Sequence, residues 1–203
     1  MLDFEENNIL KLDFQYKNLR ILELGNQITW SGITGKQLYT QKGAEHVSLD
    51  LNGRDGALTI DFGSPLKMNL GLFDLVTDYG TIEHVNNQYQ AFKNIHSLCK
   101  TSGLMIHVLP KIGHWPNHGR YYFSIEFFEQ LSLLCSYEII DMKIFNTGKH
   151  SKQKNVIGVV YKKSIDCEFL DKLSFMKIKG VHDSGSLDKT GNYKRNTSKT
   201  TGN

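Results

Sequence analysis

The chain has few cysteines and no cysteine motif. Its three cysteines, Cys99, Cys135 and Cys167, lie far apart, and no pair has the C-x-x-C spacing of a zinc or redox site. An odd number of scattered thiols without a secretory context is typical of proteins in a reducing compartment. We therefore expect reduced thiols and a cytoplasmic location, and a disulfide-stabilised scaffold is excluded.

Long apolar runs are missing as well. No window approaches the roughly 18 consecutive apolar residues that a membrane span requires. Residues 1–6 are acidic and lack the basic and apolar regions of a secretory signal. We therefore expect a soluble protein with no membrane partner.

Charge of one sign is also scarce. The net charge is only +3, and part of this excess lies beyond residue 180. A nucleic-acid-binding domain would carry a basic stripe over its folded face, and the sequence shows none. The basic segment 143–163 is interpreted as a solvated hairpin, with contact to an acidic substrate or RNA as the alternative. We expect no nucleic-acid partner.

The chain does contain a repeating alternation of short apolar runs, turn residues and longer segments of helical period. This alternation predicts an α/β fold with a mostly parallel sheet. We assign residues 1–179 to a single domain. Residues 180–203 are predicted to be a disordered tail, because their Gly, Ser, Thr, Asn and Lys residues cannot pack a core.

Seven strands and four helices are predicted. The last two strands form an antiparallel hairpin in this prediction. The clearest helix follows the fourth strand, where apolar residues at 85, 89, 92, 95 and 99 form one stripe. The strands are residues 20–24, 47–49, 57–62, 73–77, 104–109, 137–145 and 155–161; the other helices are 35–42, 125–134 and 170–178.

Two residues point to a ligand. Gly25 directly follows the first strand, where a residue without Cβ lets a ligand approach the backbone. Asp50 ends the second strand, where a carboxylate can accept hydrogen bonds from a ribose diol. Together they indicate a ligand with an adenosine-like part.

The loop after the first strand favours a methyl donor over a dinucleotide. It lacks the second and third glycines of the G-x-G-x-x-G loop that binds a pyrophosphate. Glu23 would also repel phosphates, whereas it suits a sulfonium compound with an ammonium group.

Four segments in order resemble the class I S-adenosylmethionine-dependent methyltransferases. ILELG at 21–25 resembles their motif I, and HVSLD at 46–50 resembles their second motif. FDLVTDYGTIEHV at 73–85 is similar to the "FDLV…EHV" segment of their small-molecule branch, and TSGLMIH at 101–107 to their fifth-strand turn. The resemblance runs from about residue 20 to 161. It implies a Rossmann-like three-layer sandwich with a seven-stranded sheet and S-adenosyl-L-methionine as cofactor.

Carried over by position, the resemblance implies a set of cofactor-binding residues. These are Glu23, Gly25, Asn26 and Gln27 at the methionine part, Asp50 at the ribose, Leu51 and Asp61 at the adenine, and Asp78 and Tyr79 facing the reacting methyl group. Asn26 and Gln27 depart from the small residues usual in the family. They either bind the amino-acid part of the cofactor or crowd it. The alternative for the two aspartates at 61 and 78 is a turn or helix cap without a ligand.

Histidines supply the candidate bases. His84 follows the fourth strand and His118 lies in a loop after the fifth, both at the ligand end of the sheet. His114, Arg120 and Tyr121 in the same loop are predicted to bind the substrate. A metal site of His114 and His118, completed by His84 or an aspartate, is an alternative, and no metal is assigned. The alternative for His84 is a structural role at the helix start.

The sequence therefore predicts a methyltransferase that modifies a small polar acceptor, such as a sugar or metabolite hydroxyl. The small-molecule substrate is the expected partner. A degenerate member of the fold that binds a ligand without catalysis is the main alternative, and a nucleotide-dependent oxidoreductase is a weaker one.

Overall fold

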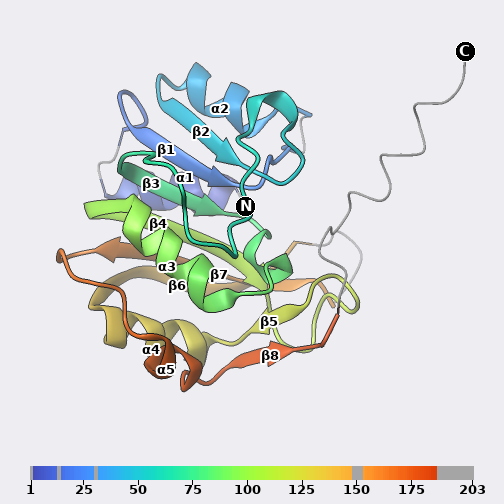
Figure 1. Ribbon diagram of the computed structural model, residues 1–203. Helices are drawn as coiled ribbons and strands as arrows, with labels where there is room; N and C mark the ends of the chain where they lie inside the picture. The colour runs from blue at the N-terminus through green and yellow to red at the C-terminus, as the bar shows by residue number, and fades with distance from the viewer. Residues whose placement is uncertain (1, 13–14, 30–31, 148–152, 187–203) are drawn as a thin grey trace, which may run out of the picture.

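A six-stranded sheet forms the centre of the computed structural model, which describes residues 2–12, 15–29, 32–147 and 153–186 (Figure 1). The strand order is β2-β1-β3-β4-β7-β6. The first four pair in parallel, whereas β7 pairs antiparallel with both β4 and β6. This confirms the predicted α/β fold with its antiparallel hairpin. The strands are β1 (Arg20–Leu24), β2 (Glu45–Leu49), β3 (Phe73–Asp78), β4 (Cys99–Pro110), β6 (Tyr137–Asn146) and β7 (Asn155–Lys163).

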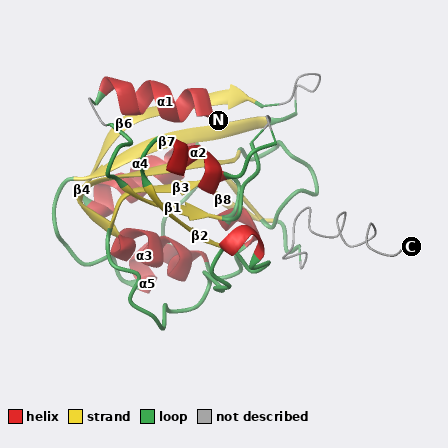
Figure 2. Cartoon of the chain, turned by 90° about the horizontal axis from the view of Figure 1, so that it is seen from above, coloured by secondary structure: helices red, strands yellow, loops and turns green. Residues whose placement is uncertain are grey.

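Helices cover both faces of the sheet (Figure 2). One face carries α1 (Leu2–Lys11) and α2 (Gly35–Gln41), and the other carries α3 (Gln88–Leu98), α4 (Ile125–Cys135) and α5 (Lys172–Met176). The strands alternate accordingly, because successive side chains point to opposite faces. Ile21 packs with the first group of helices, whereas Leu22 and Leu24 pack with the second. In the described part of the chain, none of the helices combines the length and the apolar character of a membrane span.

The predicted third strand does not form, so the main sheet has six strands where seven were expected. In this segment Leu58 makes a single parallel bridge with Leu49. The N–H of Leu58 donates a hydrogen bond to the carbonyl of Ser48, and its carbonyl accepts one from the N–H of Asp50. The pairing stops because Asp61 turns the chain: its carboxylate accepts hydrogen bonds from the backbone of Gly63 and the hydroxyl of Ser64.

A second, two-stranded sheet was not predicted. β5 (Tyr121–Phe123) pairs antiparallel with β8 (Val181–Asp183). The prediction of a disordered tail from residue 180 is therefore wrong for Val181–Asp183. These residues form a strand in spite of the polar composition of the segment, because they pair with β5, which is distant in sequence. Residues 187–203 lie outside the described part of the chain.

Helix α1 was not predicted either, and a buried carboxylate attaches it to the sheet. Glu5 is fully buried and accepts hydrogen bonds from the hydroxyls of Tyr16 at 2.7 Å, Tyr39 at 2.8 Å and Tyr79. The terminal helix predicted at 170–178 forms only over Lys172–Met176, as α5. It begins after Asp171 because the side chain of this residue accepts hydrogen bonds from the backbone of the first turn.

Candidate functional site

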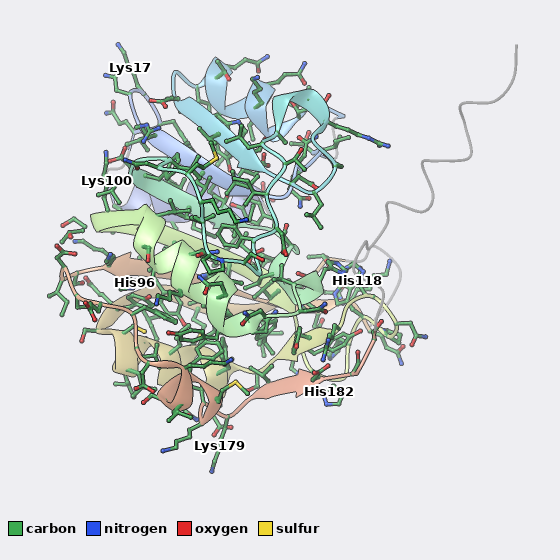
Figure 3. All side chains as sticks on the ribbon, viewed as in Figure 1. Lys17, His96, Lys100, His118, Lys179 and His182 are labelled. Atoms are coloured by element: carbon green, nitrogen blue, oxygen red, sulfur yellow. The ribbon has the colours of Figure 1, made fainter. Side chains whose placement is uncertain are left out.

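A cavity of about 470 Å³ opens at the carboxyl ends of β1 and β2. In an open parallel sheet this edge is where ligands bind, beside the point where the strand order reverses. Figure 3 shows His118 on this side of the molecule, far from Lys17 and Lys100 at the opposite edge. The lining comprises Leu24, Asn26, Gln27, Leu49, Asp50, Leu51, Ile60, Asp61, Phe62, Gly63, Gly80, Thr81, His84, Val85, Asn86, Asn87 and His118.

The loop after β1 approaches the loop after β3 closely at Gly25. This residue has a φ of 80°, a backbone conformation that favours glycine. A Cβ here would lie 2.5 Å from Oγ1 of Thr81, a contact that no side chain tolerates. The Thr81 hydroxyl donates a hydrogen bond of 2.8 Å to the carbonyl of Leu24. Gly25 therefore shapes the cavity through the backbone, and its own atoms are not in the lining.

Asp50 ties two loops together at the cavity. Its Oδ2 accepts a hydrogen bond of 2.8 Å from the backbone N–H of Asn26, and its Oδ1 accepts one of 2.9 Å from that of Asn52. Leu51, which is 54% exposed, and Asp61 line the same cavity. The residues predicted to contact ribose and adenine are thus brought together.

Glu23 lies beneath this loop and not in the cavity lining. It is buried, and its Oε2 is 3.1 Å from Nε2 of His46. Burial raises the pKa of the Glu23 carboxyl, and the neighbouring His46 opposes that rise. A Cβ at Gly35 would lie only 2.1 Å from the carboxylate, so α2 begins directly against it. Glu23 supports the junction of β1 and α2.

Asp78 is placed differently from its predicted position at the reacting group. It is fully buried, its Oδ1 accepts hydrogen bonds from the backbone of Thr81 and Ile82, and its Oδ2 lies 3.0 Å from Nδ1 of His107. Burial raises the pKa of the Asp78 carboxyl, and His107 lowers it. Asp78 thus caps the loop after β3, which is the alternative weighed for it. Tyr79 is also outside the first cavity, with its hydroxyl bonded to Glu5.

A second cavity of about 1010 Å³ adjoins the first. The two share Gln27, Gly80 and His118 in their linings. The second cavity lies between α1, the loop after β3, and the strands β4, β6 and β7. Its other lining residues in the described part of the chain are Asp3, Phe4, Asn7, Tyr79, Glu83, Val108, Pro110, Trp115, Lys143, Phe145, Asn146, Thr147, Lys154 and Val156.

Two histidines and a glutamate, the His–Glu cluster of Glu83, His84 and His118, lie where the cavities meet. Nε2 of His118 is 3.3 Å and Nε2 of His84 is 3.8 Å from Oε1 of Glu83. The two imidazole rings stand edge to face with centroids 5.0 Å apart. Both histidines that were predicted as bases are therefore in the site, together with Glu83, for which no role was predicted.

The three residues predicted to bind substrate lie outside both cavities. His114 contacts Asn155, and Arg120 makes a bidentate ion pair with Asp183 at 2.8 Å for each bond. The hydroxyl of Tyr121 donates to the carbonyl of Asn86. These side chains attach the 112–123 loop to its neighbours. Arg120 is not available to a substrate because it forms an ion pair with Asp183 of β8, a strand that was not predicted.

Sequence reasoning missed other lining residues. Thr81 and Glu83 belong to the segment after β3 that carried the resemblance, so their neighbourhood was signalled but not their roles. Trp115 lies between His114 and His118 in the sequence, and its ring centroid is 5.0 Å from that of His118. Only the packing of α1 against β6 and β7 reveals the second cavity.

Comparison with known proteins shows the fold. No family model and no curated protein sequence matches the chain. Among solved structures, it resembles the 1,6-didemethyltoxoflavin-N1-methyltransferase of Burkholderia thailandensis, with 12% identity, a TM-score of 0.56, and coverage of 79% of this chain and 76% of that one. That structure contains S-adenosylhomocysteine.

Two further structures extend the comparison. The N-methyltransferase NodS of Bradyrhizobium japonicum has 12% identity and a TM-score of 0.52, over 78% of this chain and 94% of that one. The [4+2]-cyclase SpnF has 12% identity and a TM-score of 0.57, over 79% and 81%. The chain thus has the Rossmann-like fold of S-adenosylmethionine-dependent methyltransferases, a fold that also occurs in a cyclase.

Proposed function

We propose that this chain is an S-adenosylmethionine-dependent methyltransferase that acts on a small polar acceptor, with a sugar or metabolite hydroxyl as the methylated group. The observation that carries the proposal is the pair of adjoining cavities, which share Gln27, Gly80 and His118 at the ligand end of the sheet. An in-line displacement needs donor and acceptor held in contact, and adjoining cavities provide that arrangement.

The first cavity would hold the cofactor. Asp50 would accept hydrogen bonds from the ribose hydroxyls, Leu51 would pack on the adenine and Asp61 would meet its amine. Asn26 and Gln27 would contact the methionine part. The position of these side chains around one cavity supports the assignment, as does the fold shared with a methyltransferase that binds S-adenosylhomocysteine.

The second cavity would hold the acceptor, and the His–Glu cluster would take its proton. The acceptor oxygen attacks the methyl carbon, the carbon–sulfur bond breaks to release S-adenosylhomocysteine, and the hydroxyl proton passes to His118. Glu83, 3.3 Å from His118, would stabilise the imidazolium that forms. A cavity of this size suits a small molecule better than a nucleic acid.

Gln27 favours the alternative of a protein that binds the cofactor without methyl transfer. Its amide lies 3.4 Å from the Thr81 hydroxyl, and its side chain lines both cavities. It therefore stands between the places for donor and acceptor. The same fold in a [4+2]-cyclase underlines that fold does not determine activity.

Isothermal titration calorimetry with S-adenosylhomocysteine tests the proposal. We expect binding in the micromolar range, with no binding of NAD at the same concentrations. No heat of binding at about 1 mM ligand would overturn both the enzyme and the cofactor-binding alternative. Binding without formation of S-adenosylhomocysteine from S-adenosylmethionine, over a panel of hydroxyl acceptors, would favour the alternative.

A further inference from the structure

The donor atoms of the His–Glu cluster lie close together. One carboxylate oxygen of Glu83 and one ring nitrogen each of His84 and His118 all lie within 4.8 Å of one another. Two bonds of about 2.05 Å at a tetrahedral angle separate the ligand atoms of a zinc ion by about 3.3 Å. The 3.3 Å between His118 and Glu83 matches this spacing, and the 3.8 Å to His84 needs only a small closing movement.

The carboxylate of Glu83 is buried without a hydrogen-bond partner. The residue is 1% exposed, and neither Oε1 nor Oε2 accepts a hydrogen bond within the described part of the chain. The nearby imidazole of His118 is at hydrogen-bonding distance but not in hydrogen-bonding geometry. Leaving a buried carboxylate without a hydrogen bond is costly, so a positive charge beside Glu83 would be stabilising, and a bound cation would supply one.

The backbone makes room for this carboxylate. A Cβ at Gly80 would lie 3.1 Å from Oε1 of Glu83, and one at Gly119 would lie 2.8 Å from its Cγ. The side chain thus passes between two glycines from different loops. This places its carboxylate close to the two histidines.

We propose that Glu83, His84 and His118 bind a divalent transition-metal ion, with Zn²⁺ as the best match. Two imidazoles and one carboxylate with an open fourth position are the ligand set of catalytic zinc sites. Mg²⁺ and Ca²⁺ prefer oxygen ligands, so the two nitrogen donors select against them.

Neighbouring hydrogen bonds hold the loops that present the ligands. The Tyr122 hydroxyl accepts hydrogen bonds from the backbone of His118 at 3.2 Å and Gly119 at 3.3 Å. On the other side, Asp78 caps the turn that carries Glu83 and His84. The ligands therefore come from two loops that are each anchored by a strand residue, Asp78 of β3 and Tyr122 of β5, which is what a preformed site requires.

The open position of the ion would face the junction of the cavities. His84 lines the first cavity, Glu83 the second and His118 both. A bound Zn²⁺ would occupy the ring nitrogen of His118 and replace it as the activating group: it would hold the acceptor oxygen there and lower its pKa, so that the hydroxyl proton would pass to solvent. This role, unlike metal binding itself, rests on the proposed methyl transfer, and it favours acceptors that bind metal through a hydroxyl or carboxylate oxygen.

Metal titration tests the site without an activity assay. Protein freed of metal by dialysis against a chelator is titrated with Zn²⁺ in competition with a chromogenic chelator, and Mg²⁺ is the negative control. We expect one Zn²⁺ per chain. Glu83→Gln and His118→Gln should each weaken binding by more than about 100-fold, beyond the usual effect of changes outside the ligand sphere. His182→Gln, an exposed histidine on β8, is the matched control and should bind as the parent does.

A second readout uses Trp115, whose ring is tilted against that of His118 with the centroids 5.0 Å apart. Co²⁺ added in place of Zn²⁺ should quench its fluorescence in the parent protein and not in His118→Gln. His118 is partly exposed, so this variant still tests the site if Glu83→Gln fails to fold. Absence of stoichiometric Zn²⁺ binding, or equal binding by the variants, would overturn the proposal and leave the cluster as a proton relay.

Titration of S-adenosylhomocysteine into the metal-free protein separates the two proposals. Zn²⁺ binding without cofactor binding would leave the metal site standing and remove the proposed function. Cofactor binding without Zn²⁺ binding would do the reverse.

Discussion

Replacing Asp50 by asparagine should weaken the binding of S-adenosylhomocysteine. In the structure each carboxylate oxygen already accepts one backbone hydrogen bond, from Asn26 and from Asn52. In the proposed complex the ribose diol would add its own hydrogen bonds to this carboxylate. The amide replaces one acceptor by a donor, which faces a backbone N–H and cannot bond to it. We expect a loss of about 1–3 kcal/mol in binding, or about 5–150-fold in Kd.

Calorimetry on the variant and on Asp55→Asn provides the measurement. Asp55 is an exposed carboxylate that accepts a hydrogen bond from the side chain of Asn26 and is outside the cavity lining, so its variant controls for charge in this region. Its Kd should stay within about twofold of the parent. A ligand without the ribose 2′-hydroxyl should bind less well to the parent but show little further loss with Asp50→Asn. Unchanged affinity in Asp50→Asn would refute the ribose assignment.

Two other predictions concern buried groups. Burial raises the pKa of Glu5 from its ordinary 4.5, so its folded state holds the proton more tightly than its unfolded state and stability is lost as pH rises through the folded pKa. Urea unfolding from about pH 5 to about pH 8 should therefore show a steeper loss of stability in the parent than in Glu5→Gln, and parallel curves would contradict the reasoning. Burial also raises the pKa of Cys99 to about 12 and of Cys135 to about 11. At about pH 8 an aromatic disulfide reagent should modify only the partly exposed Cys167 rapidly in native protein, and all three thiols in denaturant; fast native reaction of a second thiol would contradict it.

Most of the main sheet could be predicted from local pattern. Apolar runs and turn residues located β1 to β4 and the final hairpin, and the stripe from Val85 to Cys99 located α3, because each element carries its own period. The elements that were missed depend on distant partners. Helix α1 docks through Glu5 and three tyrosines from other parts of the chain, and β8 forms on β5. The predicted strand at 57–62 does not form for a related reason: an apolar run in the sequence does not guarantee that a neighbouring strand is present to pair with it.

The candidate site divides in the same way. Asn26, Gln27, Asp50, Leu51 and Asp61 line the first cavity as their positions at strand ends indicated, although their roles toward a cofactor stay predictions. Strand ends can be located from sequence because parallel strands bring them to one edge. The direction in which a side chain points from that edge is decided by packing.

The sequence by itself determined the α/β fold, the edge of the sheet where a ligand would bind, and the presence of His84 and His118 at that edge. Only the tertiary structure decided which of the predicted polar groups are bonded to other residues of the protein and which can still bind a ligand. Asp78 and Arg120 are taken up by His107 and Asp183, whereas the buried carboxylate of Glu83 is left facing two histidines. Hydrogen bonds and ion pairs of this kind join residues far apart in the chain, so they depend on three-dimensional neighbours that no local pattern specifies.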